Sequence, residues 1–204
     1  QKCRPNHIFE YIKLVGINFR KMTPAVIVAF DALSKVLPDI TLLIHAQAEL
    51  EKLPIEVQEI VKKNDRLEYL VKTVPAPGLY HQADVHIFPT KLEGLGLPLM
   101  EGLACGLPTV VTDAPPMNEF VKDGYNGMLI KVGREITRND NIAFPETVVD
   151  INDLVAKMKY IATNPEIVEK MKENALRSVD ENLSVTRMRN RLNDILIDVI
   201  KRAR

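Results

Sequence analysis

Two glutamates flank a pair of glycines and form the clearest chemical pattern in the sequence. Glu93 stands directly before the loop that contains Gly94 and Gly96, and seven residues separate it from Glu101. Glycine lets the backbone turn tightly and brings bare N–H groups close to a ligand. The pattern therefore predicts a loop that binds a ligand with its main chain and is framed by two acids.

A short helix is expected to begin directly after the glycines. Pro98 suits its first turn, where the missing N–H costs nothing, and Gly106 followed by Pro108 predicts its end. Unpaired N–H groups and the helix dipole favour an anion at such an N-terminus, phosphate above all. Glu101 lies about one turn into this helix, where side chains lean back toward the N-terminus, so it can face the same crevice as Glu93.

The two acids are expected to contact hydroxyl groups rather than the phosphate. A carboxylate accepts two hydrogen bonds from a vicinal diol, as it does from ribose in dinucleotide-binding folds. Glu93 and Glu101 thus predict a ligand with both phosphates and sugars. The alternative is that Glu101 only complements the helix dipole and Glu93 is a solvated loop acid. That alternative is preferred for an isolated glutamate, whereas the glycines, the spacing and the flanking strands together favour the ligand.

The composition describes a globular domain and limits the kinds of partner. The 204 residues are 46% hydrophobic, and 27 basic side chains balance 27 acidic ones, so a sizeable core can form and no general nucleic-acid or membrane surface is expected. Cys3 and Cys105 are too few for a disulfide framework or a metal site, which predicts a reducing, cytoplasmic setting. No apolar stretch reaches membrane-spanning length, and Asp and His ligands for Mg²⁺ or Mn²⁺ do not cluster, so we expect no transmembrane segment, metal or cofactor.

Alternating strands and helices are predicted to position these residues. Strand-forming runs and helical periodicity alternate at short spacing after a lead-in or linker at residues 1–9. Such alternation means parallel strands joined by right-handed helical crossovers, with helices on both faces. The predicted fold class is therefore α/β, a Rossmann-like doubly wound parallel sheet. The expected strands are 11–17, 40–46, 67–71, 85–88, 109–112 and 127–132, and the expected helices among them include 23–36, 55–63, 79–83 and 116–121.

The C-terminal part is expected to be helical after one long loop. Residues 133–149 lack clear periodicity and predict a loop, whereas 151–162, 165–180 and 184–201 predict helices. The last helix has an apolar face, which packs either on this domain's own sheet or on a missing partner. The expected division of the chain is a lead-in at 1–9, a Rossmann-like nucleotide-sugar-binding domain at 10–180 and a C-terminal helix at 181–204.

Loops at the carboxyl ends of the strands are expected to share one rim, where open α/β sheets bind their ligands. Arg20 and Lys21 follow the first strand and are placed to neutralise a diphosphate from the side opposite the helix N-terminus; the alternative is a pair of surface cations. His45 ends the second strand, Thr90 follows the fourth, and both are further rim candidates. A lone histidine such as His45 is more often a packed or hydrogen-bonded residue than a catalyst.

The stretch from Glu93 to Glu101, Glu-Gly-Leu-Gly-Leu-Pro-Leu-Met-Glu, is followed by Gly-Leu-Ala-Cys-Gly-Leu-Pro-Thr-Val-Val-Thr-Asp. It resembles the donor-site signature of retaining nucleotide-sugar glycosyltransferases of family four, which have the GT-B architecture. Similar stretches occur at 84–90, 106–113 and 119–127, so the resemblance covers about residues 10 to 180. It implies that the chain is one half of a GT-B enzyme, with no counterpart here of the N-terminal acceptor half.

The resemblance also implies roles for the loop residues. Glu93 and the N–H groups of Gly94, Leu95 and Gly96 would hold the donor sugar and the distal phosphate. Glu101 would hold the ribose. The family's basic pair, described next, would hold the diphosphate.

The basic pair matches the family only in part. Lys21 fits the family's lysine. The family's arginine stands just after a strand glycine, and Ile17 occupies that place here; Arg20 either substitutes for it or does not. His45 also departs from the family, which more often has a glycine there.

By this resemblance, the function is retaining transfer of a sugar from a nucleotide diphosphate sugar, most often UDP- or GDP-linked, to a sugar or lipid acceptor held by the missing half. The catalytic residues are expected in that half, and Arg20, Lys21 and the amides of Gly94–Gly96 would stabilise the leaving diphosphate without a metal. Family members are thought to react on one face of the sugar with no covalent intermediate. Two alternatives stay open: a non-catalytic nucleotide-sugar-binding module, and a related GT-B epimerase or phosphorylase.

Overall fold

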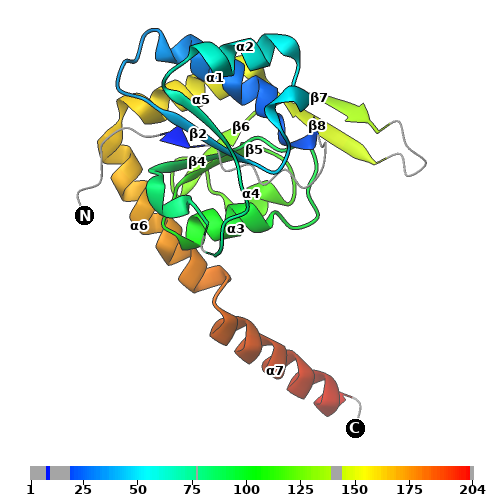
Figure 1. The fold of residues 1–204 in the computed structure, drawn as a ribbon. Coiled ribbons are helices and arrows are strands. Elements are labelled where there is room, and N and C mark those ends of the chain that lie inside the picture. The colour runs from blue at the N-terminus through cyan, green and yellow to red at the C-terminus, as the bar shows by residue number, and fades with distance from the viewer. Residues whose placement is uncertain (1–7, 10–18, 77, 139–143, 203–204) are drawn as a thin grey trace.

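Parallel strands form the centre of the protein, with helices above and below them (Figure 1). The computed structural model describes residues 8–9, 19–76, 78–138 and 144–202. Four strands pair in parallel in the order β1-β4-β5-β6, and β2 and β3 form a second parallel pair beside β1. The bounds are β1 Ile8–Phe9, β2 Leu42–Ala46, β3 Leu67–Val71, β4 Val85–Phe88, β5 Thr109–Thr112 and β6 Gly127–Ile130.

Helices cover both faces of these strands because successive strand residues point to opposite sides. Ile87 of β4 and Val110 of β5 pack into the core beneath helices α1 and α5. Their neighbours Phe88 and Val111 pack into a second core beneath α3. This arrangement confirms the doubly wound α/β fold predicted from the sequence. The helices are α1 Thr23–Ser34, α2 Ile55–Lys63, α3 Leu97–Ala104, α4 Met117–Phe120, α5 Ile151–Thr163, α6 Pro165–Asn182 and α7 Val185–Arg202, with shorter 3₁₀ turns η1 Phe19–Lys21, η2 Leu50–Lys52 and η3 Tyr80–Gln82.

The beginning of the chain differs from the sequence-based expectation. Ile8–Phe9 lie within the stretch expected to be a lead-in, yet they form β1 and pair with Val85 and His86 of β4. Residues 11–17, where the sequence predicts the first strand, lie outside the described residues. The limits of the predicted domains remain predictions.

The expectation of a long loop at 133–149 was wrong. Two antiparallel strands, β7 Val132–Thr137 and β8 Pro145–Val149, form a hairpin there. Most of β7 is exposed, including Arg134 and Glu135, so no alternation of apolar and polar residues marks it in the sequence. The hairpin is held instead by its main-chain ladder, which sequence periodicity does not reveal.

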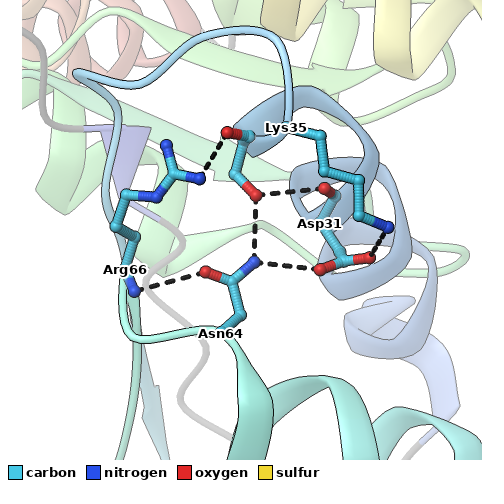
Figure 2. Close-up of polar contacts among 5 residues, drawn as sticks. Asp31, Lys35, Asn64 and Arg66 are labelled. Atoms are coloured by element: carbon cyan, nitrogen blue, oxygen red, sulfur yellow. Dashed lines mark hydrogen bonds and ion pairs between the residues drawn. The ribbon is translucent and has the colours of Figure 1, made fainter.

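Arg66 closes the C-terminal end of α1, as Figure 2 shows. Its Nη1 donates to the carbonyl of Leu37 over 3.0 Å, and its Nη2 donates to the carbonyl of Ser34. Asn64 adds bonds to Asp31 Oδ1 (3.0 Å) and to the Ser34 hydroxyl (2.9 Å). The last carbonyls of a helix have no partner within the helix, so the bonds from Arg66 satisfy acceptors that would otherwise lack a donor. The cluster precedes β3 and therefore lies at the opposite end of the strands from the glycine loop.

This network stabilises the ionised form of Asp31. Partial burial opposes its charge, but hydrogen bonds from Lys35 (2.7 Å) and Asn64 outweigh burial and hold the pKa of Asp31 below its ordinary value. The carboxylate thus ties α1 to the segment between α2 and β3. We interpret this cluster as structural.

The last helix, α7, extends away from the body of the protein (Figure 1). None of its residues is buried. Its apolar face is therefore open to solvent, and the alternative in which it packs on this domain's own sheet was wrong. The exposed residues of that face are Met188, Leu192, Ile195, Leu196 and Val199. Among the described residues, no helix combines the length and apolar character needed to span a membrane.

The cap formed by Arg66 can be tested by replacing the guanidinium with an apolar chain of similar length. Arg66→Met leaves the carbonyls of Ser34 and Leu37 without their charged donor, so we expect the free energy of unfolding to fall by about 1–3 kcal/mol. Urea denaturation measures the change. Arg177→Met, at an exposed position of α6, is the matched control and is expected to change stability little. Equal effects of the two substitutions would contradict the capping role.

Candidate functional site

The loop between β4 and α3 has the geometry that its glycines predict. Gly96 is the N-cap of α3 with φ 76°, a left-handed conformation that favours glycine. A Cβ added there would also lie 2.4 Å from Cε of Met117. A Cβ added at Gly94 would meet no heavy atom within 4 Å, so a ligand can approach the loop at that point. Leu95, between the two glycines, is 51% exposed.

Lys21, Thr90 and Glu93 form a buried polar cluster beside this loop. Lys21 Nζ makes an ion pair with Glu93 Oε1, and the Thr90 hydroxyl donates to the same oxygen over 2.8 Å. The two ionised side chains are only 8% and 11% exposed. Lys21 Nζ also lies 4.2 Å from the centre of the Phe88 ring, a cation–π contact. Burial lowers the pKa of Lys21, and the hydrogen bond to Glu93 opposes that shift.

Main-chain bonds fix the loop from two sides. The Lys91 N–H donates to the carbonyl of Arg20 (2.8 Å), and the Lys91 carbonyl accepts from both the N–H (2.9 Å) and the hydroxyl (3.1 Å) of Thr147 in β8. The hairpin is therefore attached to the loop that carries Glu93. Arg20 Nε is buried and lacks a hydrogen-bond partner within the described part of the chain. A buried donor of this kind can bind an anion.

Glu101 lies on α3 as expected, with an exposed side chain. Its Oε2 accepts a hydrogen bond from the hydroxyl of Tyr80 over 3.0 Å. That hydroxyl is also 3.1 Å from the carbonyl oxygen of Pro98, in the first turn of the same helix. One oxygen of the carboxylate is thus held by the protein.

A model of the family described as glycosyl transferases group 1 matches residues 16–144, which contain the loop, both glutamates, Arg20 and Lys21. The chain belongs to this family. Among the described residues, no group of three or more His, Cys, Asp or Glu side chains could hold a metal ion.

Two curated relatives illustrate the range of similar proteins. The chain is 32% identical over 137 residues to the UDP-N-acetylglucosamine--peptide N-acetylglucosaminyltransferase GtfA subunit of Streptococcus agalactiae, covering 62% of this chain and 26% of that protein. It is 24% identical over 168 residues to the UDP-Gal:alpha-D-GlcNAc-diphosphoundecaprenol alpha-1,3-galactosyltransferase of Escherichia coli, covering 82% of this chain and 39% of that protein. The chain thus spans less than half the length of these relatives.

Solved structures of glycosyltransferases share the fold. The C-terminal domain of a glycosyl transferase group 1 family protein (LpcC) from Francisella tularensis superposes with a TM-score of 0.68 at 19% identity, covering 89% of this chain and 88% of that one. Pneumococcal GtfA, solved with UDP and GlcNAc, gives a TM-score of 0.72 at 20% identity, covering 97% of this chain and 36% of that one. The predicted fold, one half of the GT-B architecture, is confirmed.

The structure brings some of the sequence-predicted residues of this glycosyltransferase domain together and leaves others apart. Lys21, Thr90 and Glu93 touch one another, and Arg20 is joined to them through the Lys91 main chain. His45 lies in the other parallel pair, where it is buried and its Nε2 bonds to the carbonyl of Lys72. That position agrees with the packed alternative.

Three contributors to the site escaped the sequence analysis. Tyr80 was expected only as part of a short helical segment, Phe88 only as a strand residue, and Thr147 as part of a loop. Each contacts a residue that is distant in the sequence, and no local sequence pattern indicates such a contact. The only available signal was the position of Phe88 two residues before Thr90, which places both at the carboxyl end of β4.

The Lys21–Glu93 pair predicts a strong energetic coupling. Lys21→Met or Glu93→Gln alone leaves one buried charge without its partner, so we expect each to destabilise the fold by roughly 3 kcal/mol. The double variant removes both charges, and its loss is expected to fall short of the sum by about 1–3 kcal/mol. Urea denaturation of the four proteins measures this cycle.

The exposed pair Lys63–Glu59 on α2 is the matched control, with side chains 75% and 48% exposed. Lys63→Met and Glu59→Gln should be nearly additive, because solvent screens exposed pairs. Coupling at Lys21–Glu93 no larger than in this control would contradict the buried ion pair.

Proposed function

We propose that this chain is the donor-binding domain of a retaining glycosyltransferase and holds a nucleotide diphosphate sugar for transfer to an acceptor bound by a second, N-terminal domain. The observation that carries the proposal is the buried cluster of Lys21, Thr90 and Glu93 beside the N-terminus of α3. It sets a cation and an acid beside the main-chain N–H groups at the N-terminus of α3. Such a set matches a ligand with phosphates and sugar hydroxyls.

The diphosphate is assigned to the basic side of the site. Lys21 supplies a positive charge that Glu93 supports against burial, and Arg20 Nε supplies a donor. The N–H groups of Gly94, Leu95 and Gly96 complete the cradle at the helix N-terminus. Charge builds on the leaving diphosphate during transfer, so these preorganised donors lower the barrier.

The sugars are assigned to the two glutamates. Glu93 accepts hydrogen bonds from the hydroxyls of the donor sugar, and Glu101 accepts them from the ribose. When the diphosphate binds, Lys21 gains phosphate oxygens as partners while Glu93 gains hydroxyl donors, so both groups keep hydrogen-bond partners. Glu93 is thereby committed to binding, and transfer on one face of the sugar proceeds without a covalent enzyme intermediate.

The acceptor, a sugar or a lipid, is assigned to a domain that these residues do not contain. The exposed apolar face of α7 supports a docking role toward that domain, because leaving it in water is unfavourable. UDP is the first nucleotide to test, since two relatives carry UDP-sugars in their names. The scarcity of cysteine supports a cytoplasmic setting.

We expect the chain to bind a nucleoside diphosphate without a divalent metal. Arg20, Lys21 and the loop amides neutralise the phosphates, so the affinity should be the same in chelator and in Mg²⁺. Titration calorimetry with UDP, GDP and ADP under both conditions measures this. Binding that appears only with Mg²⁺ would overturn the metal-independent site.

We further expect residues 1–204 to fold and bind donor but to transfer no sugar. Positioning accelerates a reaction when the reacting atoms are held roughly 3–3.5 Å apart, and a single rim offers no second wall to hold the acceptor. Donor hydrolysis and transfer should stay at background and rise when the N-terminal domain is restored. Robust transfer by the isolated chain would contradict the proposal that half of the active site lies elsewhere.

A further inference from the structure

The hydroxyl of Tyr80 holds one oxygen of Glu101. Tyr80 belongs to the turn η3 before β4, whereas Glu101 lies on α3, and the two side chains meet at 3.0 Å. The tyrosine ring is 2% exposed, so its position is set by packing. The glutamate is exposed and would otherwise sample several rotamers in water.

The ring of Tyr80 rests on a rigid support. Its edge packs against His86 of β4, with ring centres 5.6 Å apart and planes at 85°. His86 in turn stacks on Phe88 and lies directly beneath α3, where a Cβ added at Gly102 would be 2.8 Å from His86 Nδ1. The helix and the tyrosine are therefore fixed on the same imidazole. The hydroxyl is placed by this packing and does not follow the glutamate.

We propose that Tyr80 is a positioning residue that sets the selectivity of the site for ribose over deoxyribose. Its hydroxyl donates a hydrogen bond to Oε2 of Glu101 and so orients Oε1 toward the sugar hydroxyls of the nucleotide. An ionised carboxylate has lone pairs for both partners, so the tyrosine and a diol bind it together. This inference rests on the proposed function, because it assigns a second residue to the ribose end of the same site.

The test compares ribonucleotides with their 2′-deoxy counterparts. UDP, GDP and ADP are titrated against dUDP, dGDP and dADP, and the ratio of dissociation constants measures ribose selectivity. We expect the wild-type chain to prefer the ribonucleotide by roughly two- to tenfold, the effect of one hydrogen bond. Tyr80→Phe keeps the buried ring and removes only the hydroxyl, so this ratio should fall toward one.

Two further variants separate positioning from a general loss of structure. Tyr69→Phe removes a tyrosine hydroxyl that bonds to the Ala48 carbonyl over 2.9 Å, away from α3, and should leave the ratio unchanged. Glu101→Ala should abolish the selectivity by itself, and adding Tyr80→Phe to it should cause no further change. A loss of selectivity in Tyr80→Phe that meets both conditions supports the inference.

The remaining outcomes overturn different statements. An unchanged ratio in Tyr80→Phe, or an equal fall in Tyr69→Phe, overturns the role of Tyr80 and leaves the proposed function standing. Equal binding of ribose and deoxyribose forms by the wild type overturns the assignment of Glu101 to ribose and the role of Tyr80 with it. Failure of the folded wild-type chain to bind any of the three ribonucleotides overturns the proposed function itself.

Discussion

The ion pair between Lys21 and Glu93 is the constraint on which the site depends. Removing two charges from water is costly unless each finds a close partner and further hydrogen bonds. Thr90 supplies such a bond to the acid, and the Phe88 ring lies against the cation. Because the charges neutralise each other, the protein can keep both side chains largely buried at the carboxyl ends of the strands. A ligand then meets groups that are already oriented and partly desolvated.

The parallel sheet makes this pairing possible. Lys21 and Glu93 are 72 residues apart in the sequence, and the hairpin residue Thr147 is farther still from Lys21. The loops that follow parallel strands all lie at the carboxyl ends of those strands, where polar side chains and main-chain groups can meet. Arg20, Lys91 and Thr147 are linked there by consecutive main-chain bonds. The parallel topology therefore brings these site residues together without a ligand.

The local parts of the site could be predicted from the sequence, and the distant contacts could not. Gly96 and Pro98 specify a turn and a helix start through their own backbone preferences, so the loop and α3 were predicted correctly. Burial also follows from apolar periodicity, which located most strands and helices. Tyr80 packs on His86 and reaches Glu101 from a separate turn, and no residue near it in the chain signals that contact. The hairpin was mistaken for a loop because β7 is largely exposed and carries charges where alternation would be expected.

The close approach of Gly102 to His86 restricts which substitutions these two positions tolerate. A methyl group at position 102 would lie 2.8 Å from His86 Nδ1, so either the buried imidazole or α3 would have to shift, and a shift of α3 would also move Glu101. A smaller side chain in place of His86 would remove the closest contact. The two positions are thus tied across the interface between helix and strand. Replacing Gly102 while His86 is kept therefore requires one of these two elements to move.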